Sequence, residues 1–281
     1  MTERIAVLGA GQMGNGIAHV FAQAGFDVSM IDISKTALAK GRETIARNLD
    51  RQIKKGAIQE ADKVGTLERI TDHDSLDAVK DASLVIEAVT ENRELKAKIF
   101  AELDAKASAG AILATNTSSI SITEIAGGTK RPELVIGMHF MNPVPVMQLV
   151  EIIRGIATSD ATTAKVLELS KAVGKTPVEV NDYPGFIANR ILMPMINEAV
   201  YCLMEGVGTA DAIDTVMKLG MNHPMGPLAL ADFIGLDTCL AILEVMHAGL
   251  GDPKYRPCPL LRKYVAAGWL GRKSGRGFYQ Y

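Results

Sequence analysis

The sequence predicts an α/β domain with a doubly wound, mostly parallel sheet, followed by an all-α domain. Short β-branched runs alternate with helical patterns over the first two thirds of the chain, which is typical of a parallel sheet covered by helices. A glycine-rich turn follows the first of these runs. After Tyr183-Pro184-Gly185 helical patterns take over, and no convincing strand follows before the last few residues. We therefore expect two domains, over residues 1–183 and 184–281.

Each element is expected for a local reason. The buried strands are apolar runs rich in Val and Ile, and the helices carry apolar residues at intervals of three and four. Strands are expected at residues 4–8, 26–31, 83–88, 111–115, 134–140, 150–153 and 176–180. Helices are expected at residues 12–24, 34–55 (capped by Ser34), 91–106 and 160–173, and in the second domain at 186–204, 210–219, 226–248 and 259–267.

Composition excludes several classes of protein. The chain of 281 residues carries 30 Lys and Arg against 32 Asp and Glu, a net charge of −2, so it has no basic field to hold nucleic acid or an anionic membrane. No apolar run approaches the roughly 20 residues that span a bilayer, and the N-terminus lacks a signal-peptide pattern. The 3 cysteines are widely spaced, which fits neither a disulfide framework nor a zinc site. We therefore expect a cytoplasmic protein without metal, nucleic-acid or membrane partners.

The glycine-rich turn has the form G-x-G-x-x-G, with Gly9, Gly11 and Gly14 at the fixed positions. The first glycine permits a tight turn, the second lets a pyrophosphate approach the backbone, and the third allows the helix to pack closely on the strand. The helix that begins there offers free N–H groups to phosphates. Asp32, at the end of the second strand, stands where a carboxylate binds the adenosine ribose and repels a 2′-phosphate. These features predict a Rossmann-like domain that binds NAD rather than NADP; the alternative is a turn without a dinucleotide.

Several polar residues interrupt apolar segments, where burial costs free energy unless a partner compensates. Glu151 stands within a predicted strand, His139 lies near the end of another, and Asn189 lies on the apolar face of a helix. A hydroxyl- and amide-rich segment, residues 115–119, directly follows an apolar strand, and ligands of α/β sheets bind beyond the carboxyl ends of strands. Each feature alone is more often structural, as a core histidine or a helix cap.

These residue types suit alcohol oxidation by NAD, which moves a hydride to the nicotinamide and a proton to a base. Imidazole is the natural base near neutral pH, and a neighbouring carboxylate orients the ring and stabilises the imidazolium. A hydroxyl and an amide can hold the substrate oxygen. Spacing along the chain leaves open whether His139 and Glu151 meet.

With these residues in place, the chain resembles the (S)-3-hydroxyacyl-CoA dehydrogenase family over essentially its whole length. The segments that carry the resemblance are GAGQMG at 9–14, VIEAVTENRELK at 85–96, ATNTSS at 114–119, GMHFMNPVPVMQLVEII at 137–153, DYPGFIANRIL at 182–192, HPMGPLALADFIGLD at 223–237 and GRKSGRGFYQY at 271–281. Jointly these segments are very specific.

The resemblance implies reversible interconversion of acetoacetyl-CoA and (S)-3-hydroxybutyryl-CoA with NAD(H). It makes His139 the general acid and base, Glu151 its partner acid, and Ser118 and Asn189 the substrate-contacting residues. It also implies a homodimer joined through the helical domain. With the glycine turn, the expected cofactor contacts are Gly9, Gly11, Gln12, Met13, Gly14, Asp32, Glu91, Lys96, Asn116, Ser118, Asn142 and Lys273.

A basic stripe on helix 34–55 includes Arg51, Lys54 and Lys55 and is a candidate site for the CoA phosphates, although such stripes are more often solvated faces. Two other functions stay open. One is a Rossmann-like hydroxyacid dehydrogenase that acts on a substrate without CoA. Many of these use a lysine base on the second domain, where this chain has Asn189. The other is a dinucleotide-binding protein without catalysis.

Overall fold

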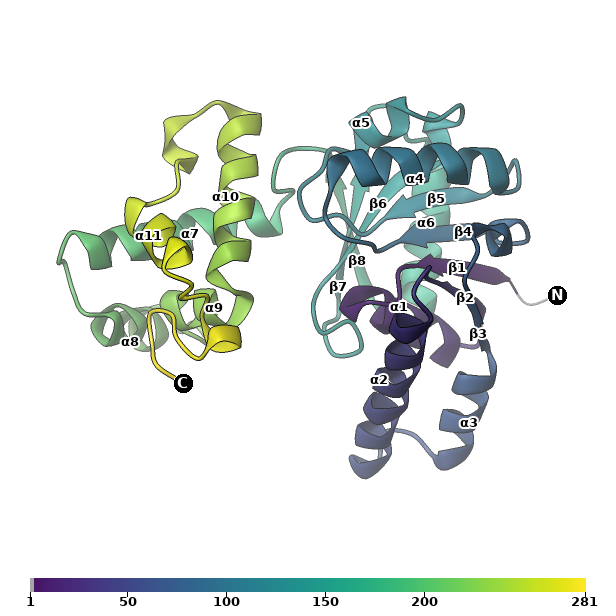
Figure 1. Ribbon diagram of the computed structural model, residues 1–281, viewed down its shortest axis with the longest axis horizontal. Helices are drawn as coiled ribbons and strands as arrows, with labels where there is room; N and C mark the ends of the chain where they lie inside the picture. Colours follow the sequence, from purple (N-terminus) through teal and green to yellow (C-terminus); the bar gives the residue numbers. More distant parts are fainter. Residues whose placement is uncertain (1–2) are drawn as a thin grey trace. The chain divides into compact units, whose positions relative to one another are not determined.

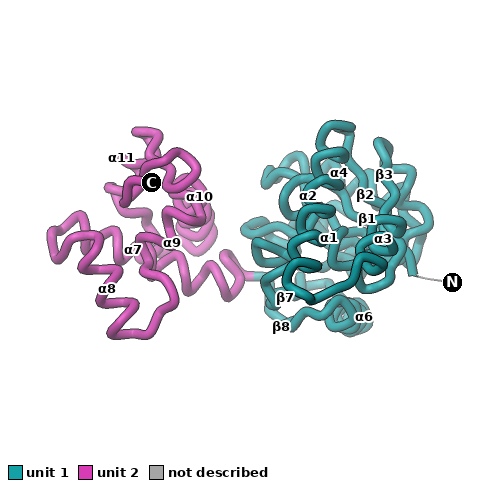
Figure 2. Tube along the Cα trace, turned by 90° about the horizontal axis from the view of Figure 1, so that it is seen from below, with its two compact units in different colours: residues 1–182 teal, residues 183–281 magenta. Residues whose placement is uncertain are grey.

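The computed structural model describes residues 3–281, and the chain divides into two compact units (Figures 1 and 2). Unit 1 spans Met1–Asp182 and carries the sheet, whereas unit 2 spans Tyr183–Tyr281 and is helical. Among residues 3–281, no helix combines the length and apolar character needed to cross a membrane.

Unit 1 is built on one eight-stranded sheet. Its strands are β1 (Arg4–Leu8), β2 (Asp27–Ile31), β3 (Ile70–His73), β4 (Leu84–Glu87), β5 (Ile112–Thr115), β6 (Val135–Phe140), β7 (Leu149–Arg154) and β8 (Thr176–Asn181). Their order across the sheet is β3-β2-β1-β4-β5-β6-β7-β8, and all neighbours run parallel except β6 and β7. The expected doubly wound, mostly parallel sheet is confirmed.

Helices cover both faces of this sheet (Figure 1). They are α1 (Gln12–Gln23), α2 (Lys35–Lys54), α3 (Glu60–Glu68), α4 (Arg93–Lys106), α5 (Ile122–Gly127) and α6 (Asp160–Ala172), with 3-10 turns η1 (Leu76–Val79) and η2 (Pro132–Leu134). Ser34 caps α2 as expected, because its side chain accepts a hydrogen bond from the Ala37 N–H. Asn92 caps α4 in the same way, so Glu91, which we expected inside this helix, lies just before it.

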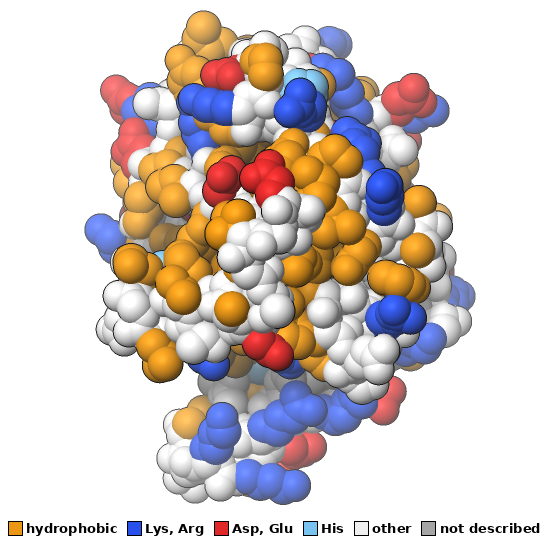
Figure 3. Space-filling model, turned by 90° about the vertical axis from the view of Figure 1, so that its left-hand side faces the viewer, with side chains coloured by type: hydrophobic (Ala, Val, Ile, Leu, Met, Phe, Trp, Pro, Cys, Tyr) orange, Lys and Arg blue, Asp and Glu red, His pale blue; other side chains and the backbone are white. Residues whose placement is uncertain are grey.

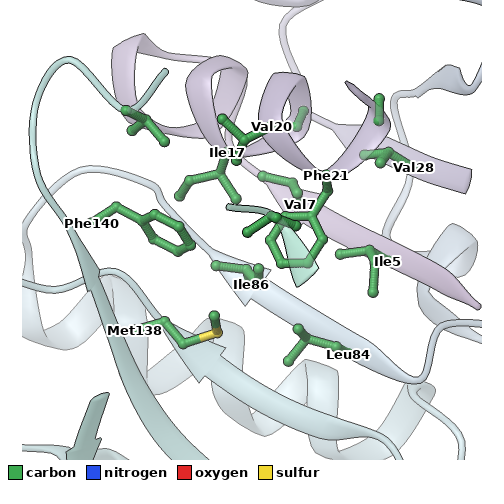
Figure 4. Close-up of a cluster of buried hydrophobic side chains, with 14 of the residues drawn as sticks. Ile5, Val7, Ile17, Val20, Phe21, Val28, Leu84, Ile86, Met138 and Phe140 are labelled. Atoms are coloured by element: carbon green, nitrogen blue, oxygen red, sulfur yellow. The ribbon is translucent and has the colours of Figure 1, made fainter. Parts of the chain in front are cut away.

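The main core of unit 1 lies between the sheet and α1. Leu84 and Ile86 of β4 join the same buried cluster as Ile17 and Phe21 of α1 (Figure 4). Val85 is fully buried outside this cluster, because successive strand residues point to opposite faces. Since both faces are covered, the central parallel strands β1, β4 and β5 appear in the sequence as nearly continuous apolar runs.

Two regions differ from the expected elements. Residues 56–82 contain α3, β3 and η1, none of which we expected, because β3 is an edge strand in which only Ile70 is buried. The helix expected over 226–248 is wrong as a single element. It is divided into α9 (Pro227–Ile234) and α10 (Leu236–Leu250) by Gly235, whose φ of +105° is incompatible with a continuing helix.

Unit 2 packs its helices around a core of its own. Its elements are α7 (Ala188–Met204), α8 (Ala210–Gly220), α9, α10 and α11 (Pro259–Ala266), with η3 (Pro253–Tyr255) and η4 (Arg272–Ser274). Asn189 is 8% exposed and shares its buried face with Met193, Ile196 and Val200, as the helical spacing predicts.

Candidate active site

The carboxyl ends of β1, β4, β5 and β6 lie along one edge of the sheet, because these strands are parallel. The strand order reverses between β1 and β4: β2 and β3 follow β1 on one side, and β5 to β8 follow β4 on the other. Ligands of doubly wound sheets bind at such a reversal. Most of the residues singled out by the sequence lie at or beside this edge.

The turn after β1 is shaped to admit a ligand beside its backbone. A Cβ on Gly9 would lie 2.7 Å from the Ala88 carbonyl oxygen, and one on Gly14 would lie 1.7 Å from the Gly9 carbonyl oxygen, so neither position accepts a side chain. At Gly11 no atom lies within 4 Å of the same point, and the space there is open. With the N-terminus of α1 beside it, this cradle fits the pyrophosphate of a dinucleotide.

Asp32 lies next to this cradle at the end of β2. Its Oδ2 accepts a hydrogen bond from the Ala10 N–H (2.9 Å), and its Oδ1 accepts one from the Ser34 N–H (2.9 Å). Both bonds hold the carboxylate at the position expected for the ribose contact. On the other side of the cradle, Gln12 donates from Nε2 to Asn142 Oδ1 (3.0 Å).

His139 and Glu151 meet across the antiparallel pair of β6 and β7, where they stand directly opposite each other. His139 Nδ1 and Glu151 Oε2 are 2.8 Å apart, and the residues are 6% and 2% exposed. An ionised carboxylate only accepts hydrogen bonds, so Nδ1 carries the proton in this pair. Ser118 Oγ lies 3.1 Å from Nε2.

The segment after β5 is tied to the end of β6 and to the segment after β4. Asn116 Oδ1 accepts a hydrogen bond from the N–H of Phe140 (2.9 Å), the residue that follows His139 in the sequence. This bond holds the Asn116 amide at the end of β6. Glu91 Oε1 accepts from the Ser118 N–H (2.9 Å), the Thr117 hydroxyl (2.6 Å), the Ser119 N–H (3.0 Å) and the Ser119 hydroxyl (2.9 Å). These bonds bring Glu91, Asn116 and Ser118 together.

Lys96 is almost fully buried, at 1% exposed, and its ammonium forms ion pairs with two carboxylates. Nζ lies 2.6 Å from Glu87 Oε1 and 3.5 Å from Glu91 Oε2. Sequence reasoning missed Glu87, which is 0% exposed and also accepts hydrogen bonds from the Thr115 hydroxyl (2.7 Å) and the Val89 N–H (2.7 Å). The signal was available, because a carboxylate closes the apolar run LVIE just as Glu151 interrupts its own strand.

A cavity of about 520 Å³ lies between the start of α1, one face of α2 and residues 142–145. Its polar lining includes Gln12, Lys40, Asn48, Arg51 and Asn142. Of the expected CoA-binding cations, Arg51 lines this cavity, whereas Lys54 and Lys55 are exposed at the end of α2 and do not line it.

Two basic side chains of unit 1, Lys175 and His19, are buried. Lys175 donates from Nζ to the carbonyl oxygens of Val144 and Met147 (2.8 Å for the latter), and so holds the loop that lines the cavity. Burial lowers the pKa of this lysine. His19 of α1 is 0% exposed, and burial lowers its pKa to about 4, so it is neutral near neutral pH.

Two expected site residues belong to unit 2. Asn189 is buried at the start of α7, and Lys273 in η4 donates from Nζ to Asp237 Oδ2 (2.7 Å). All the other expected site residues belong to unit 1. Within residues 3–281, no three or more His, Cys, Asp or Glu side chains are grouped so that they could hold a metal ion.

Comparison with known proteins identifies the family. Residues 4–183 match the family domain described as 3-hydroxyacyl-CoA dehydrogenase, NAD binding domain, and residues 185–281 match the corresponding C-terminal domain. A Bacillus subtilis (strain 168) protein named probable 3-hydroxybutyryl-CoA dehydrogenase is 59% identical over 279 residues, covering 99% of this chain and 97% of that protein. The crystal structure of (S)-3-hydroxybutyryl-CoA dehydrogenase from Ralstonia eutropha has a TM-score of 0.97 and 55% identity, covering 100% of this chain and 99% of that one. The chain therefore belongs to the 3-hydroxyacyl-CoA dehydrogenase family.

Proposed function

We propose that the protein is an NAD-dependent dehydrogenase that interconverts acetoacetyl-CoA and (S)-3-hydroxybutyryl-CoA. The single observation that carries the proposal is the buried pair of His139 and Glu151, 2.8 Å apart at the strand-end edge where the glycine cradle also lies. Family membership and the names of relatives such as the Bacillus subtilis protein support the choice of a 3-hydroxyacyl-CoA substrate.

The geometry assigns a task to each residue of the pair. When bound, NADH supplies the hydride that reduces the C3 carbonyl of the 3-ketoacyl thioester. His139 then gives the proton on Nε2 to the C3 oxygen as negative charge develops there, and it takes the hydroxyl proton back in the oxidative direction. Glu151 accepts the hydrogen bond from Nδ1–H, which fixes the ring orientation and stabilises the imidazolium. The Ser118 hydroxyl is proposed to hold the substrate oxygen, and Asn189 is proposed as a further substrate contact, as the family resemblance implies.

The cofactor is held by the cradle after β1 and by side chains at the sheet edge. Backbone N–H groups at the start of α1 bind the pyrophosphate, and the Asp32 carboxylate binds the adenosine ribose. The proposed set of contacts is Gly9, Gly11, Gln12, Met13, Gly14, Asp32, Glu91, Lys96, Asn116, Ser118, Asn142 and Lys273.

The CoA phosphates are proposed to bind along α2 at Arg51, Lys54 and Lys55, whereas the wall of the cavity that contains Gly11 and Gln12 belongs to the proposed cofactor site. Arg51 lines this cavity, and Lys54 and Lys55 follow it at the exposed end of the same helix. Phosphate groups favour such a set of cations, and the 520 Å³ volume falls in the range of small-molecule sites.

A homodimer through unit 2 is part of the proposal. Hydrophobic side chains gather on the face of this unit shown in Figure 3. The exposed apolar residues of the unit include Val207 (73%), Val216 (60%), Leu219 (81%) and Met221 (61%). Large exposed apolar areas mark association surfaces. The free cysteines Cys202, Cys239 and Cys258 fit a reducing compartment, which we propose to be the cytoplasm.

The test is NADH oxidation with acetoacetyl-CoA, followed by absorbance, in the wild type and in His139→Ala. We expect wild-type turnover, and a loss of about a hundredfold or more in the variant with NADH affinity little changed. Wild-type activity in the variant would contradict the role of His139. Equal turnover of free acetoacetate would favour a dehydrogenase of substrates without CoA. Absence of turnover with every acyl-CoA would favour a non-catalytic NAD-binding protein.

A further inference from the structure

We infer that Glu87 and Lys96 form a buried positioning pair that sets the place of Ser118, and through it the place of the His139 imidazole. This inference rests on the proposed function, because it concerns how the proton-transferring group is held. It gives Glu87 a role and adds a positioning role, exerted through Glu91, to the cofactor contact proposed for Lys96.

The pair lies where charge is expensive to bury. Glu87 and Lys96 are 0% and 1% exposed, and their charged atoms are 2.6 Å apart. Replacing such a pair by apolar side chains is often neutral or stabilising, so the pair is weak evidence for a stabilising role. Glu87 also accepts hydrogen bonds from the hydroxyl of Thr115, the last residue of β5, and from the N–H of Val89, which follows the end of β4. The carboxylate therefore joins two strand ends at the edge of the proposed site.

Lys96 connects this buried carboxylate to Glu91. Its ammonium lies between the two, 2.6 Å from Glu87 Oε1 and 3.5 Å from Glu91 Oε2. Without this cation the buried Glu87 carboxylate would face the exposed Glu91 carboxylate, and their repulsion would drive Glu91 outward toward water. The position of Glu91 thus depends on the pair.

Glu91 in turn holds the segment that carries Ser118. Its Oε1 accepts from the Ser118 N–H at 2.9 Å and from both the N–H and the hydroxyl of Ser119. Ser118 Oγ lies 3.1 Å from His139 Nε2, so this hydroxyl meets the atom that exchanges the proton. The contacts run from Glu87 through Lys96, Glu91 and Ser118 to His139. A displacement of about 1 Å at reacting groups costs about a hundredfold in rate. A shift of Glu91 that moves Ser118 is therefore expected to lower kcat.

Three variants separate positioning from simple stabilisation. Lys96→Met leaves Glu87 as an unpaired buried charge, and we expect it to lower both stability and kcat. The double variant Glu87→Gln/Lys96→Met removes both charges and keeps the shape, so its stability should return toward that of the wild type. The matched control is Asp104→Asn at the opposite end of α4, where the carboxylate accepts a hydrogen bond from Arg131 Nε (2.8 Å).

The experiment measures urea stability, NADH affinity by fluorescence, and kcat and KM for acetoacetyl-CoA at saturating NADH. We expect kcat of the double variant at saturating NADH to stay about tenfold or more below that of the wild type, with KM for acetoacetyl-CoA changed by less than about threefold. The control should lose stability and keep its kcat. Recovery of kcat together with stability in the double variant would overturn the inference, as would a loss confined to NADH affinity. Inactivity of the wild type would instead overturn the proposed function.

Discussion

Among the described residues, units 1 and 2 each bury two carboxylates, Glu87 and Glu151 in the first and Asp214 and Asp232 in the second. In unit 2 the partners are mainly backbone N–H groups, two at the start of α9 and two in the C-terminal tail. In unit 1 the principal partners are a lysine and a histidine side chain at the edge of the sheet. The same residue type is buried in both units, but its surroundings differ.

The difference separates structural from functional burial. A backbone N–H donates one hydrogen bond and does not change its protonation state near neutral pH, so Asp214 and Asp232 fix the path of the chain. An imidazole can give or take a proton, so a carboxylate that holds one suits the role in proton transfer proposed for Glu151. The partners of a buried charge are therefore a better guide to its task than burial itself.

The largest expected effect comes from removing the charge of Glu151, the buried carboxylate that contacts His139. Glu151→Gln keeps the shape of the side chain and removes its charge. We expect kcat for acetoacetyl-CoA to fall about a thousandfold, because the imidazolium loses its stabilising charge and its fixed orientation. Steady-state kinetics at saturating NADH measure this. A loss of less than about tenfold would show that Glu151 does not serve His139.

His19 supplies a buried imidazole without a carboxylate partner, so it should report burial alone. Burial lowers its pKa from the usual 6.5 to about 4, so the unfolded state binds more protons between these pH values. The free energy of unfolding should therefore fall as pH falls from 6.5 to 4, by up to about 3 kcal/mol, and change no further from this group below pH 4. Urea titrations at several pH values would show a smaller decline in His19→Gln. An identical decline in the wild type and in the variant would contradict the assignment of this pH dependence to His19.

Asp214→Asn tests the structural member of the comparison. The carboxylate accepts the Leu228 and Ala229 N–H bonds at 2.9 Å and the Tyr279 hydroxyl at 2.8 Å. An amide cannot accept all three, so we expect a loss of about 2 kcal/mol in the free energy of unfolding. Turnover per folded molecule should change by less than about twofold. A large loss of kcat with unchanged stability would show that Asp214 has a functional role rather than a structural one.

The smallest expected effect concerns binding rather than proton transfer. Arg51 lines the cavity beside α2, whereas Arg47 on the same helix does not. We expect Arg51→Ala to raise KM for acetoacetyl-CoA about tenfold with kcat unchanged, the pattern of lost uniform binding. Arg47→Ala is the matched control and should leave KM within about twofold of the wild-type value. Equal effects of both variants would mean that the stripe acts only as a diffuse charge.

The parts of the fold that follow from local sequence were predictable. The glycine turn, Asp32 and the buried strands depend on backbone sterics and apolar runs that neighbouring residues determine. The division at Gly235 was missed because the apolar pattern continues on both sides of it, and only the positive φ interrupts the helix. β3 was missed because an edge strand buries too little to need an apolar run.

The residues of the candidate site could be predicted from the sequence, but their arrangement in space could not. His139 and Glu151 were singled out as polar residues in apolar strands, but their meeting depends on the register of β6 against β7, which the intervening loop sets. Glu87 was missed although it shows the same misfit, because a charge at a strand end is common and only its partners distinguish it. Asn189 was singled out as a polar residue on an apolar helix face, and Lys273 was named from the family resemblance alone. The roles of both stay predictions.

The central claim is that His139, held by Glu151, exchanges the proton at the substrate's C3 oxygen beside the nicotinamide. A crystal structure with NAD and acetoacetyl-CoA tests this most directly, since both ligands are oxidised and cannot react. We expect His139 Nε2 about 3 Å from the C3 carbonyl oxygen, and the nicotinamide C4 within about 3.5 Å of C3. A nicotinamide ring bound out of reach of this histidine, or a C3 oxygen held by another residue, would contradict the account.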